Sequence, residues 1–522
     1  MATSDDLFRL IKSLKQSEKR YFKIFSSTHV KGQQNNYVKL FEAVDKQDEY
    51  NEAAILKKFK GEKFIKQFSV TKNYLYNFIL KSLRSYYSGK DIDSKINEEL
   101  ESIKILINRG FYKKALKIVR KTKQLAWEYE KLYYLIQVLE WEYCVKITCL
   151  THDKFSIYKK DYLKERVYLF ELIENMHQYS LLLDDFYDLY REDMVVRTEE
   201  DLQKYEELIQ SPLLQSMENA LTYNAKKIFY NIWALYHTIK QDFIAAFSYD
   251  KMQLDLFEEN SKIKEDGISD YIESCHNLLY NCMKLNRYEE FEGIMNKVKV
   301  IPEKKAFAEK LTFHSYAQIF DTTHGLLLSY YFNTRQFENA LELIPSIEKG
   351  LWKFRMALDG EAKIYIYFEA AKLLFHINKL DEAMEWVSKV DAYEKQAGTD
   401  GLICYARILK LFIYYDMGDS YYDLLQYEIK STKRFLQKKE RFYQVEETIL
   451  KYLYRLVSTS SIDLTKELYM KFRKDLQYLM QQKFEESASS YLDLTYWLDS
   501  KIEQVPLKEV LIRDWKLNHS RR

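Results

Sequence analysis

The chain has 522 residues, of which 47% are hydrophobic, so it can bury a large core; its net charge of +2 gives no overall attraction to nucleic acid or to a membrane. Its 12 glycines and 4 prolines argue against β-sandwiches and phosphate-binding loops, and its five cysteines against a disulfide framework. It lacks an apolar leader and an apolar run long enough to span a bilayer. We therefore expect an all-α cytoplasmic protein without membrane contact.

The first 92 residues are predicted to form a basic helical domain. Residues 1–90 contain 18 Lys and Arg but only 9 Asp and Glu, whereas the rest of the chain is mildly acidic. Apolar residues at helical spacing predict the helices of this domain. These helices cover residues 4–25, 37–45, 52–59 and 70–87.

One short pattern recurs from about residue 95 onward. In its clearest copy, Asn378 can adopt the left-handed conformation that ends a helix, Leu380 follows, and the small Ala383 allows two helices to approach. An aromatic residue or leucine, followed three positions later by a small or apolar residue, marks each copy. These anchors are Tyr112, Phe155, Phe243, Tyr288, Phe337, Leu380 and Tyr421.

The anchors lie 41 to 49 residues apart if one diverged copy is placed near residue 199. A period of this length predicts an α-solenoid of antiparallel helix pairs over residues 93–482, followed by capping helices over residues 483–522. The alternative is an ordinary long helical protein that happens to carry aromatic residues after its turns.

The turn formed by Gly110, Tyr112 and Ala115 resembles the link between the two helices of a tetratricopeptide repeat, and the turn at Asn378 matches in part. The period is longer than the family's usual length of about 34 residues, and the tryptophan-leucine-glycine cluster of the family's first helix is absent. The chain is therefore similar to, but divergent from, that family. Residues 15–23 and 496–502 also resemble bacterial repeat proteins, a resemblance that carries no known activity.

The family resemblance implies that the first helix of each pair lines a concave surface that binds a protein or a peptide. The corresponding positions do not show the lysine and asparagine pattern that clamps a partner's terminal carboxylate. The groove candidates are Asn231, His276, Tyr280, Phe368 and Lys372. We expect a non-enzymatic interaction scaffold that needs no cofactor.

An alternative function comes from lysines in the basic domain. A short helix, a polar turn and a longer helix capped near residue 69 could form a helix-turn-helix unit, with lysines near phosphates and the longer helix near base edges. The candidate contacts are Lys57, Lys58, Lys63, Lys66, Lys72 and Asn73. The protein would then be a nucleic-acid-linked regulator with the repeats as its sensor. The simpler interpretation is a solvated lysine face on a helical cap.

No motif recommends an enzyme. Glu174 and His177, like Glu273 and His276, place a carboxylate and an imidazole on one helix face, as di-iron bundles do, but nine histidines produce such pairs by chance. A helical metalloenzyme would need further glutamates from facing helices. Residues 321–324 are predicted to be a polar helix end with a capping or packing role.

Overall fold

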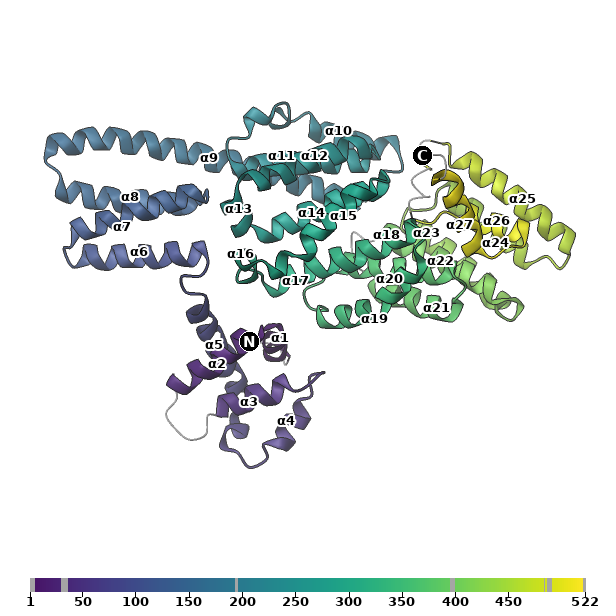
Figure 1. Ribbon diagram of the computed structural model, residues 1–522, viewed down its shortest axis with the longest axis horizontal. Helices are drawn as coiled ribbons and strands as arrows, with labels where there is room; N and C mark the ends of the chain where they lie inside the picture. Colours follow the sequence, from purple (N-terminus) through teal and green to yellow (C-terminus); the bar gives the residue numbers. More distant parts are fainter. Residues whose placement is uncertain are drawn as a thin grey trace. The chain divides into compact units, whose positions relative to one another are not determined.

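The computed structural model describes residues 5–29, 36–192, 196–394, 400–482, 484–485 and 491–519. The described residues form helices and no strand, which confirms the all-α prediction (Figure 1). The first α-helices are α1 (Asp6–Ser13), α2 (Gln16–His29), α3 (Asn36–Asp45), α4 (Glu52–Lys58), α5 (Phe68–Tyr87), α6 (Ile92–Asn108), α7 (Tyr112–Glu128), α8 (Leu132–Cys149) and α9 (His152–Glu192).

The chain continues through α10 (Glu199–Ile209), α11 (Tyr223–Ile239), α12 (Phe243–Glu259), α13 (Ser261–Asp266), α14 (Ile268–Lys284), α15 (Tyr288–Lys299), α16 (Lys305–Ala308), α17 (Phe313–Phe320), α18 (Leu327–Asn333), α19 (Phe337–Lys353), α20 (Gly360–His376) and α21 (Leu380–Ser388). The last helices are α22 (Asp400–Met417), α23 (Tyr422–Lys438), α24 (Gln444–Val457), α25 (Ile462–Leu479), α26 (Thr495–Glu503) and α27 (Leu507–His519). Short 3-10 segments join several of them, among them η1 (Lys63–Gln67).

The chain divides into two compact units. Unit 1 comprises residues 1–173, 262–268 and 302–316, and unit 2 comprises residues 174–261, 269–301 and 317–522. Within unit 1, α1 to α5 share a hydrophobic core of their own, in which the rings of Phe22 and Phe41 stack 4.6 Å apart. We call α1 to α5 the N-terminal lobe.

The N-terminal lobe follows the predicted helices with one correction. The single helix predicted over residues 4–25 is two helices, because Leu14 is extended and buried between them. The backbone N–H of Lys15 donates to the Glu18 carboxylate at 2.6 Å, which stabilises the start of α2. The predicted helices over 52–59 and 70–87 correspond to α4 and α5.

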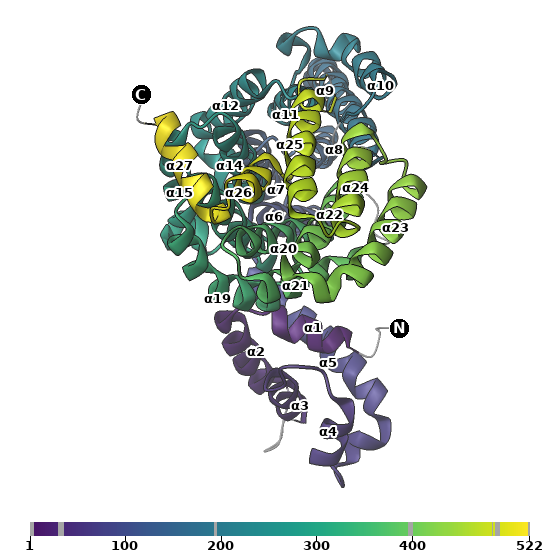
Figure 2. The same cartoon turned by 90° about the vertical axis from the view of Figure 1, so that its right-hand side faces the viewer.

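The helices that follow the lobe pack as sequence neighbours. In unit 1, α7 packs against both α6 and α8. In unit 2, α11 packs against α12, and α20 packs against α21 and α22, as Figures 1 and 2 both show. This arrangement in adjacent pairs is what a helical repeat requires.

One backbone turn recurs between these helices. A residue with φ between 51° and 77° ends the first helix, and the next N–H donates to the carbonyl five positions earlier at 2.8–2.9 Å. This bond defines a Schellman cap. The left-handed residues are Gly110, Glu130, Gln241, Asn286, Arg335, Asn378 and Glu440. The left-handed conformation predicted for Asn378 is therefore confirmed.

The predicted anchors begin the second helix at the clear copies of the turn. Tyr112, Phe243, Tyr288, Phe337 and Leu380 are the first residues of α7, α12, α15, α19 and α21. The side chain three positions later is fully buried in each case. These buried side chains are Ala115, Ala246, Phe291, Ala340 and Ala383.

The weaker copies differ from this pattern. Phe155 lies in the first turn of α9, which begins after an extended Leu150 rather than after a left-handed residue. The copy expected near residue 199 corresponds to the start of α10, where the Thr198 side chain accepts a hydrogen bond from the N–H of Asp201 at 3.1 Å.

A pair of glycines tests the close packing of α19. A Cβ atom at Gly350 would lie 1.9 Å from Cε2 of Phe320, whereas one at Gly293 in α15 would have no atom within 4 Å. We expect Gly350→Ala to lower the free energy of unfolding by about 1–3 kcal/mol through overpacking. Gly293→Ala should raise it by about 0.5–1 kcal/mol, because alanine favours a helix. Denaturant unfolding measures both, and equal effects would contradict this packing.

Candidate functional site

The first helices of successive pairs in unit 2 bring polar side chains together. His276 and Tyr280 lie one turn apart on α14, and the next first helix runs through α17, η5 (Asp321–Leu326) and α18. The Nδ1 atom of His276 lies 3.2 Å from Oγ1 of Thr322 and 3.8 Å from the Asp321 carboxylate. Two first helices therefore meet through these side chains.

The segment η5 corrects the prediction of a helix end at residues 321–324. It is a π-helical turn, and the chain continues directly into α18. The Thr323 hydroxyl donates to the carbonyl of Ile319 at 2.7 Å. A Cβ atom at Gly325 would lie 3.0 Å from an Asp321 carboxylate oxygen, so a glycine gives this carboxylate room. Single π-helical turns of this kind occur frequently at functional sites.

Burial shifts the ionisation of the groups around η5. Desolvation raises the pKa of Asp321 to about 7, and nearby Asp359 contributes in the same direction. Desolvation also lowers the pKa of His276 to about 4, although 31% of its side chain is exposed. Desolvation is the larger effect, because protein atoms surround the imidazole although part of it is exposed. Between about pH 4 and 7, both groups are therefore mainly neutral.

Helix α20 continues this polar surface. The Tyr365 hydroxyl lies 2.8 Å from the Ser329 hydroxyl of α18, and Ser329 donates to Glu369 at 2.9 Å. One turn before Tyr365, Glu361 has an exposed side chain. Neighbouring protein atoms still desolvate its carboxyl group, and this desolvation, together with Asp359 and Asp321, raises the pKa of Glu361 to about 7. Its carboxylate has no Lys or Arg ion pair within the described part of the chain.

Tyr280 lies near the centre of a group of tyrosines. It interacts electrostatically with the phenols of Tyr190, Tyr365 and Tyr491. Burial raises the pKa of Tyr190 and of Tyr365 well above the ordinary value. We call His276, Tyr280, Asp321, Glu361 and Tyr365 the inner face of unit 2. It combines phenol rings with carboxylates, which suits a cationic or hydrogen-bond-donating ligand.

A buried ion cluster joins distant segments of unit 2. The Arg197 guanidinium donates to Glu446 at 3.0 Å and to Glu485 at 3.0 Å, and it stacks 4.2 Å from the centre of the Tyr443 ring. The Tyr405 hydroxyl donates to the same Glu446 carboxylate at 2.6 Å. Arg197 follows α9, whereas Glu446 lies in the first turn of α24, so the cluster joins the segment after α9 to later helices of unit 2.

The other predicted groove residues lie in different surroundings. Asn231 on α11 is half-buried and donates weakly to the Tyr187 hydroxyl at 3.4 Å. Phe368 is 1% exposed, within the core. Lys372 pairs with Glu369 and lies over the rings of Phe332 and Phe368. Of the five predicted groove residues, only His276 and Tyr280 belong to the inner face.

Several residues of this site carried little sequence signal. Asp321 belonged to a segment interpreted as a helix cap, and Glu361 looked like an ordinary acidic residue in a first helical turn. Arg197 and Glu446 are 249 positions apart, so no local pattern could pair them. Such a buried arginine between two glutamates can be recognised only from the folded structure.

The predicted nucleic-acid contacts lie in the N-terminal lobe. Lys57, Lys58, Lys63, Lys66 and Asn73 are exposed. Lys72 instead donates to Glu52 at 2.6 Å, with 16% of its side chain exposed.

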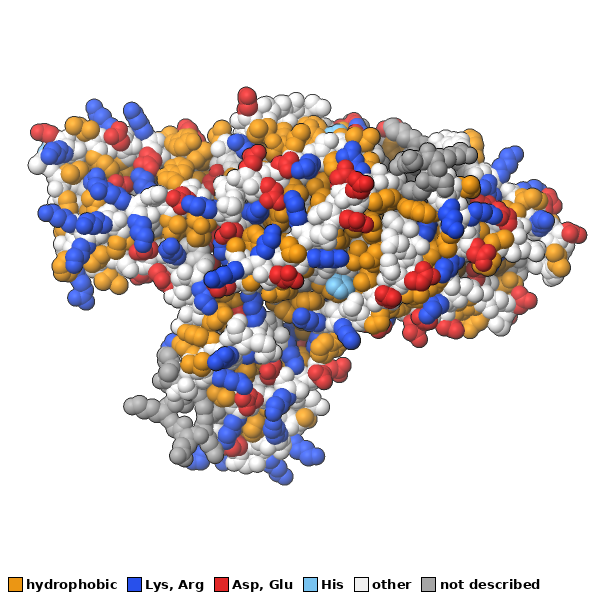
Figure 3. Space-filling view, in the orientation of Figure 1, with side chains coloured by type: hydrophobic (Ala, Val, Ile, Leu, Met, Phe, Trp, Pro, Cys, Tyr) orange, Lys and Arg blue, Asp and Glu red, His pale blue; other side chains and the backbone are white. Residues whose placement is uncertain are grey.

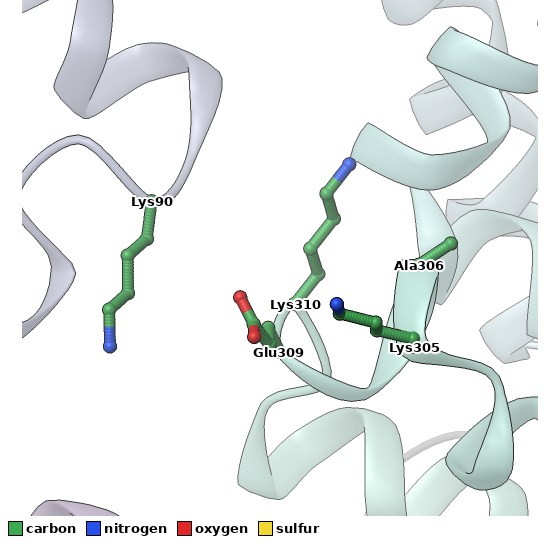
Figure 4. Close-up of a pocket in the computed structure, with 5 residues that line it drawn as sticks. All are labelled: Lys90, Lys305, Ala306, Glu309 and Lys310. Carbon is green, nitrogen blue, oxygen red and sulfur yellow. The ribbon is translucent and has the colours of Figure 1, made fainter.

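Unit 1 also contains an open pocket of about 370 Å³ (Figure 4). Lys310 at this pocket pairs with Glu265 at 3.1 Å, and Lys90 lies over the Tyr86 ring. In Figure 4, Lys90 comes from a separate segment and does not converge with Lys310. The pocket therefore offers no assembled anion site. Its lining is Lys90, Lys305, Ala306, Glu309 and Lys310.

No cluster of three or more histidine, cysteine, aspartate or glutamate side chains suited to a metal ion occurs among the described residues. Glu174 and His177 are both exposed on α9. Of the helices whose residues are described, none has both the length and the apolar character needed to cross a bilayer.

The pKa of Asp321 predicts how stability depends on pH. Between about pH 4 and 7, the native Asp321 carboxyl holds a proton that the unfolded chain has lost, so the contribution of Asp321 to stability falls as pH rises through this window. Asp321→Asn mimics the neutral form and removes this loss. Its stability advantage over wild type should grow from about pH 4 to 7 and then remain constant, reaching at most a few kcal/mol. Denaturant unfolding across this pH range measures it, and a constant difference would refute the assignment.

The ion cluster gives a second prediction. Arg197→Met leaves Glu446 and Glu485 buried without a cation, so we expect the free energy of unfolding to fall by about 3–5 kcal/mol. The triple variant Arg197→Met, Glu446→Gln and Glu485→Gln should recover much of this loss, because it removes the buried charges. Arg434→Met, at an exposed site on α23, is the control and should change stability by less than about 0.5 kcal/mol. Failure of the triple variant to recover would contradict a charge-based cost.

Comparisons with known proteins provide no match from which a function could be inferred. No protein-family model matches the chain, and no curated protein matches it.

Proposed function

We propose that this protein is a non-enzymatic cytoplasmic scaffold whose unit 2 is a divergent, tetratricopeptide-like α-solenoid. Its ligand is a peptide or an extended segment of a protein, held on the inner face. The recurrent Schellman turns and the buried small side chains after them support a repeat, because they give successive helix pairs the same geometry.

The observation that carries the proposal is the chain of contacts between consecutive first helices. His276 of α14 meets Thr322 of η5, and Ser329 of α18 meets Tyr365 of α20. Side chains that should line a solenoid groove are therefore neighbours in the folded chain. A surface that spans several repeats suits an extended ligand better than a small molecule.

The chemistry of the inner face favours a basic ligand segment. Asp321 has His276 as its nearby base, and neither Asp321 nor Glu361 forms an ion pair with Lys or Arg in the described ranges. A ligand lysine or arginine could supply the missing positive charge. Binding such a group would favour the ionised carboxylates, and the surrounding phenols could contact its aliphatic stem or its charge.

Random peptides displayed on phage and selected on the full-length protein test this proposal. We expect enrichment of sequences rich in lysine and arginine. Synthetic copies of them should bind Glu361→Lys roughly tenfold or more weakly than wild type, because like charges then oppose each other. The matched control is Glu385→Lys, the same charge change at an exposed position of the second helix α21, where affinity should stay within about twofold.

Two outcomes would contradict the proposal. The first is the absence of enriched peptides from a library that yields binders for a control protein. The second is equal loss of affinity in Glu361→Lys and Glu385→Lys, which would place the ligand away from the inner face. Circular dichroism of both variants confirms that each remains folded.

A further inference from the structure

The N-terminal lobe neutralises many of its acidic side chains internally. Asp5, Glu42, Asp45, Glu52 and Glu62 each pair with a lysine or arginine of the lobe at 2.6–3.3 Å. Glu18 is buried and accepts a hydrogen bond from the Tyr87 hydroxyl. These pairs occupy five basic side chains of the lobe, which are Arg9, Lys19, Lys23, Lys39 and Lys72.

Five lysines of the lobe lie close together in one stretch. Lys57 and Lys58 end α4, Lys60 lies in the turn that follows, and Lys63 and Lys66 lie on η1. All five are exposed, and none has a carboxylate partner in the part of the chain that the structure describes. In Figure 3, Lys and Arg side chains outnumber Asp and Glu on the N-terminal lobe. Five free lysines within ten positions form a local anion-binding surface.

Helix α5 follows this stretch directly, and its exposed side combines aliphatic, aromatic and amide side chains. Its other side packs against α1, α2 and α3. The exposed side carries Val70 at 65% exposure and Tyr74 at 50%, with Asn73 and Asn77 beside them. The Asn77 amide donates to the backbone carbonyl of Asn73 at 2.9 Å, which orients it on this side. Residues 70, 73, 74 and 77 share one face because they are three, four and seven positions apart.

Two of the neighbouring polar residues serve the lobe itself. The Thr71 hydroxyl donates to the backbone carbonyls of Phe64 and Gln67, at 3.2 Å and 3.1 Å. Lys72 pairs with Glu52 and lies 5.2 Å from the centre of the Phe68 ring. These contacts fix η1 and α4 relative to the start of α5. The free lysines are therefore held next to the exposed face of α5 by a defined structure.

We propose that the N-terminal lobe binds duplex DNA, with the exposed face of α5 in the major groove and the lysines of α4, the turn and η1 on the flanking phosphates. Asparagine amides can pair with the edge of adenine, and an aliphatic side chain such as that of Val70 can contact a thymine methyl group. Lysines as point charges suit phosphates. A membrane surface would also attract the lysines, but it would press the polar asparagine amides of α5 against an apolar layer, so duplex DNA fits this face better.

Fluorescence anisotropy with the full-length protein and a short labelled duplex of random sequence tests this inference. We expect the logarithm of the association constant to fall with the logarithm of salt concentration, with a slope of about −4 to −5 if five phosphates are contacted. Reversing Lys57, Lys58, Lys63 and Lys66 to Glu should weaken binding by at least roughly 100-fold. The matched control reverses Lys438, Lys451, Lys466 and Lys474, four exposed lysines of unit 2, and should bind nearly as well as wild type.

A second variant tests the role of α5 separately from charge on the lysine stretch. Val70→Glu changes an exposed side chain, so the lobe should stay folded, but the new carboxylate would enter the groove and weaken binding at least roughly tenfold. Wild-type affinity in Val70→Glu would overturn the placement of α5. Absence of duplex binding at low salt, equal losses in the two lysine variants, or binding only to anionic phosphatidylserine vesicles would overturn the inference itself.

Discussion

The left-handed residue that ends one helix and turns the chain into the next is the constraint on which the paired helices depend. It reverses the chain within a few residues, and the bond from the next N–H to the carbonyl five positions earlier fixes the direction in which the second helix leaves. The second helix can then bury a small or apolar side chain such as Ala340 or Ala383. Each copy of this turn therefore joins its two helices through the same backbone hydrogen bond.

Four of these turns use residues that do not favour the left-handed conformation. Glu130, Gln241, Arg335 and Glu440 have φ between 51° and 60°, which costs roughly 1–2 kcal/mol for a residue with a Cβ atom. The Schellman bond and the helix packing around each turn offset this cost. At Arg335 the side chain adds a contact of its own, because its guanidinium donates to the backbone carbonyl of Phe332 at 3.2 Å.

The inner face of unit 2 and the N-terminal lobe differ in which sign of charge lacks a partner. In the inner face of unit 2, the carboxyl groups of Asp321 and Glu361 are desolvated and have no Lys or Arg partner among the described residues. A bound cation would therefore stabilise their ionised forms. In the N-terminal lobe, several carboxylates are paired, whereas the five lysines of α4, the turn and η1 have no carboxylate partner among the described residues. Arg197 shows a third arrangement, in which one buried cation is shared by two glutamates and serves structure alone. A net charge of +2 for the whole chain conceals all three.

The sequence by itself determined the helical class, the helices of the N-terminal lobe and the main turns at Gly110, Asn286 and Asn378, because these depend on local spacing and on residues that tolerate positive φ. It also named His276 and Tyr280 as groove residues, and their role in a groove stays a prediction. Only the tertiary structure decided that Phe368 and Lys372 are covered, that residues 321–326 form a π-helical turn, and that Arg197 meets Glu446. These outcomes depend on contacts between residues far apart in the chain, and such contacts leave no periodic trace in the sequence.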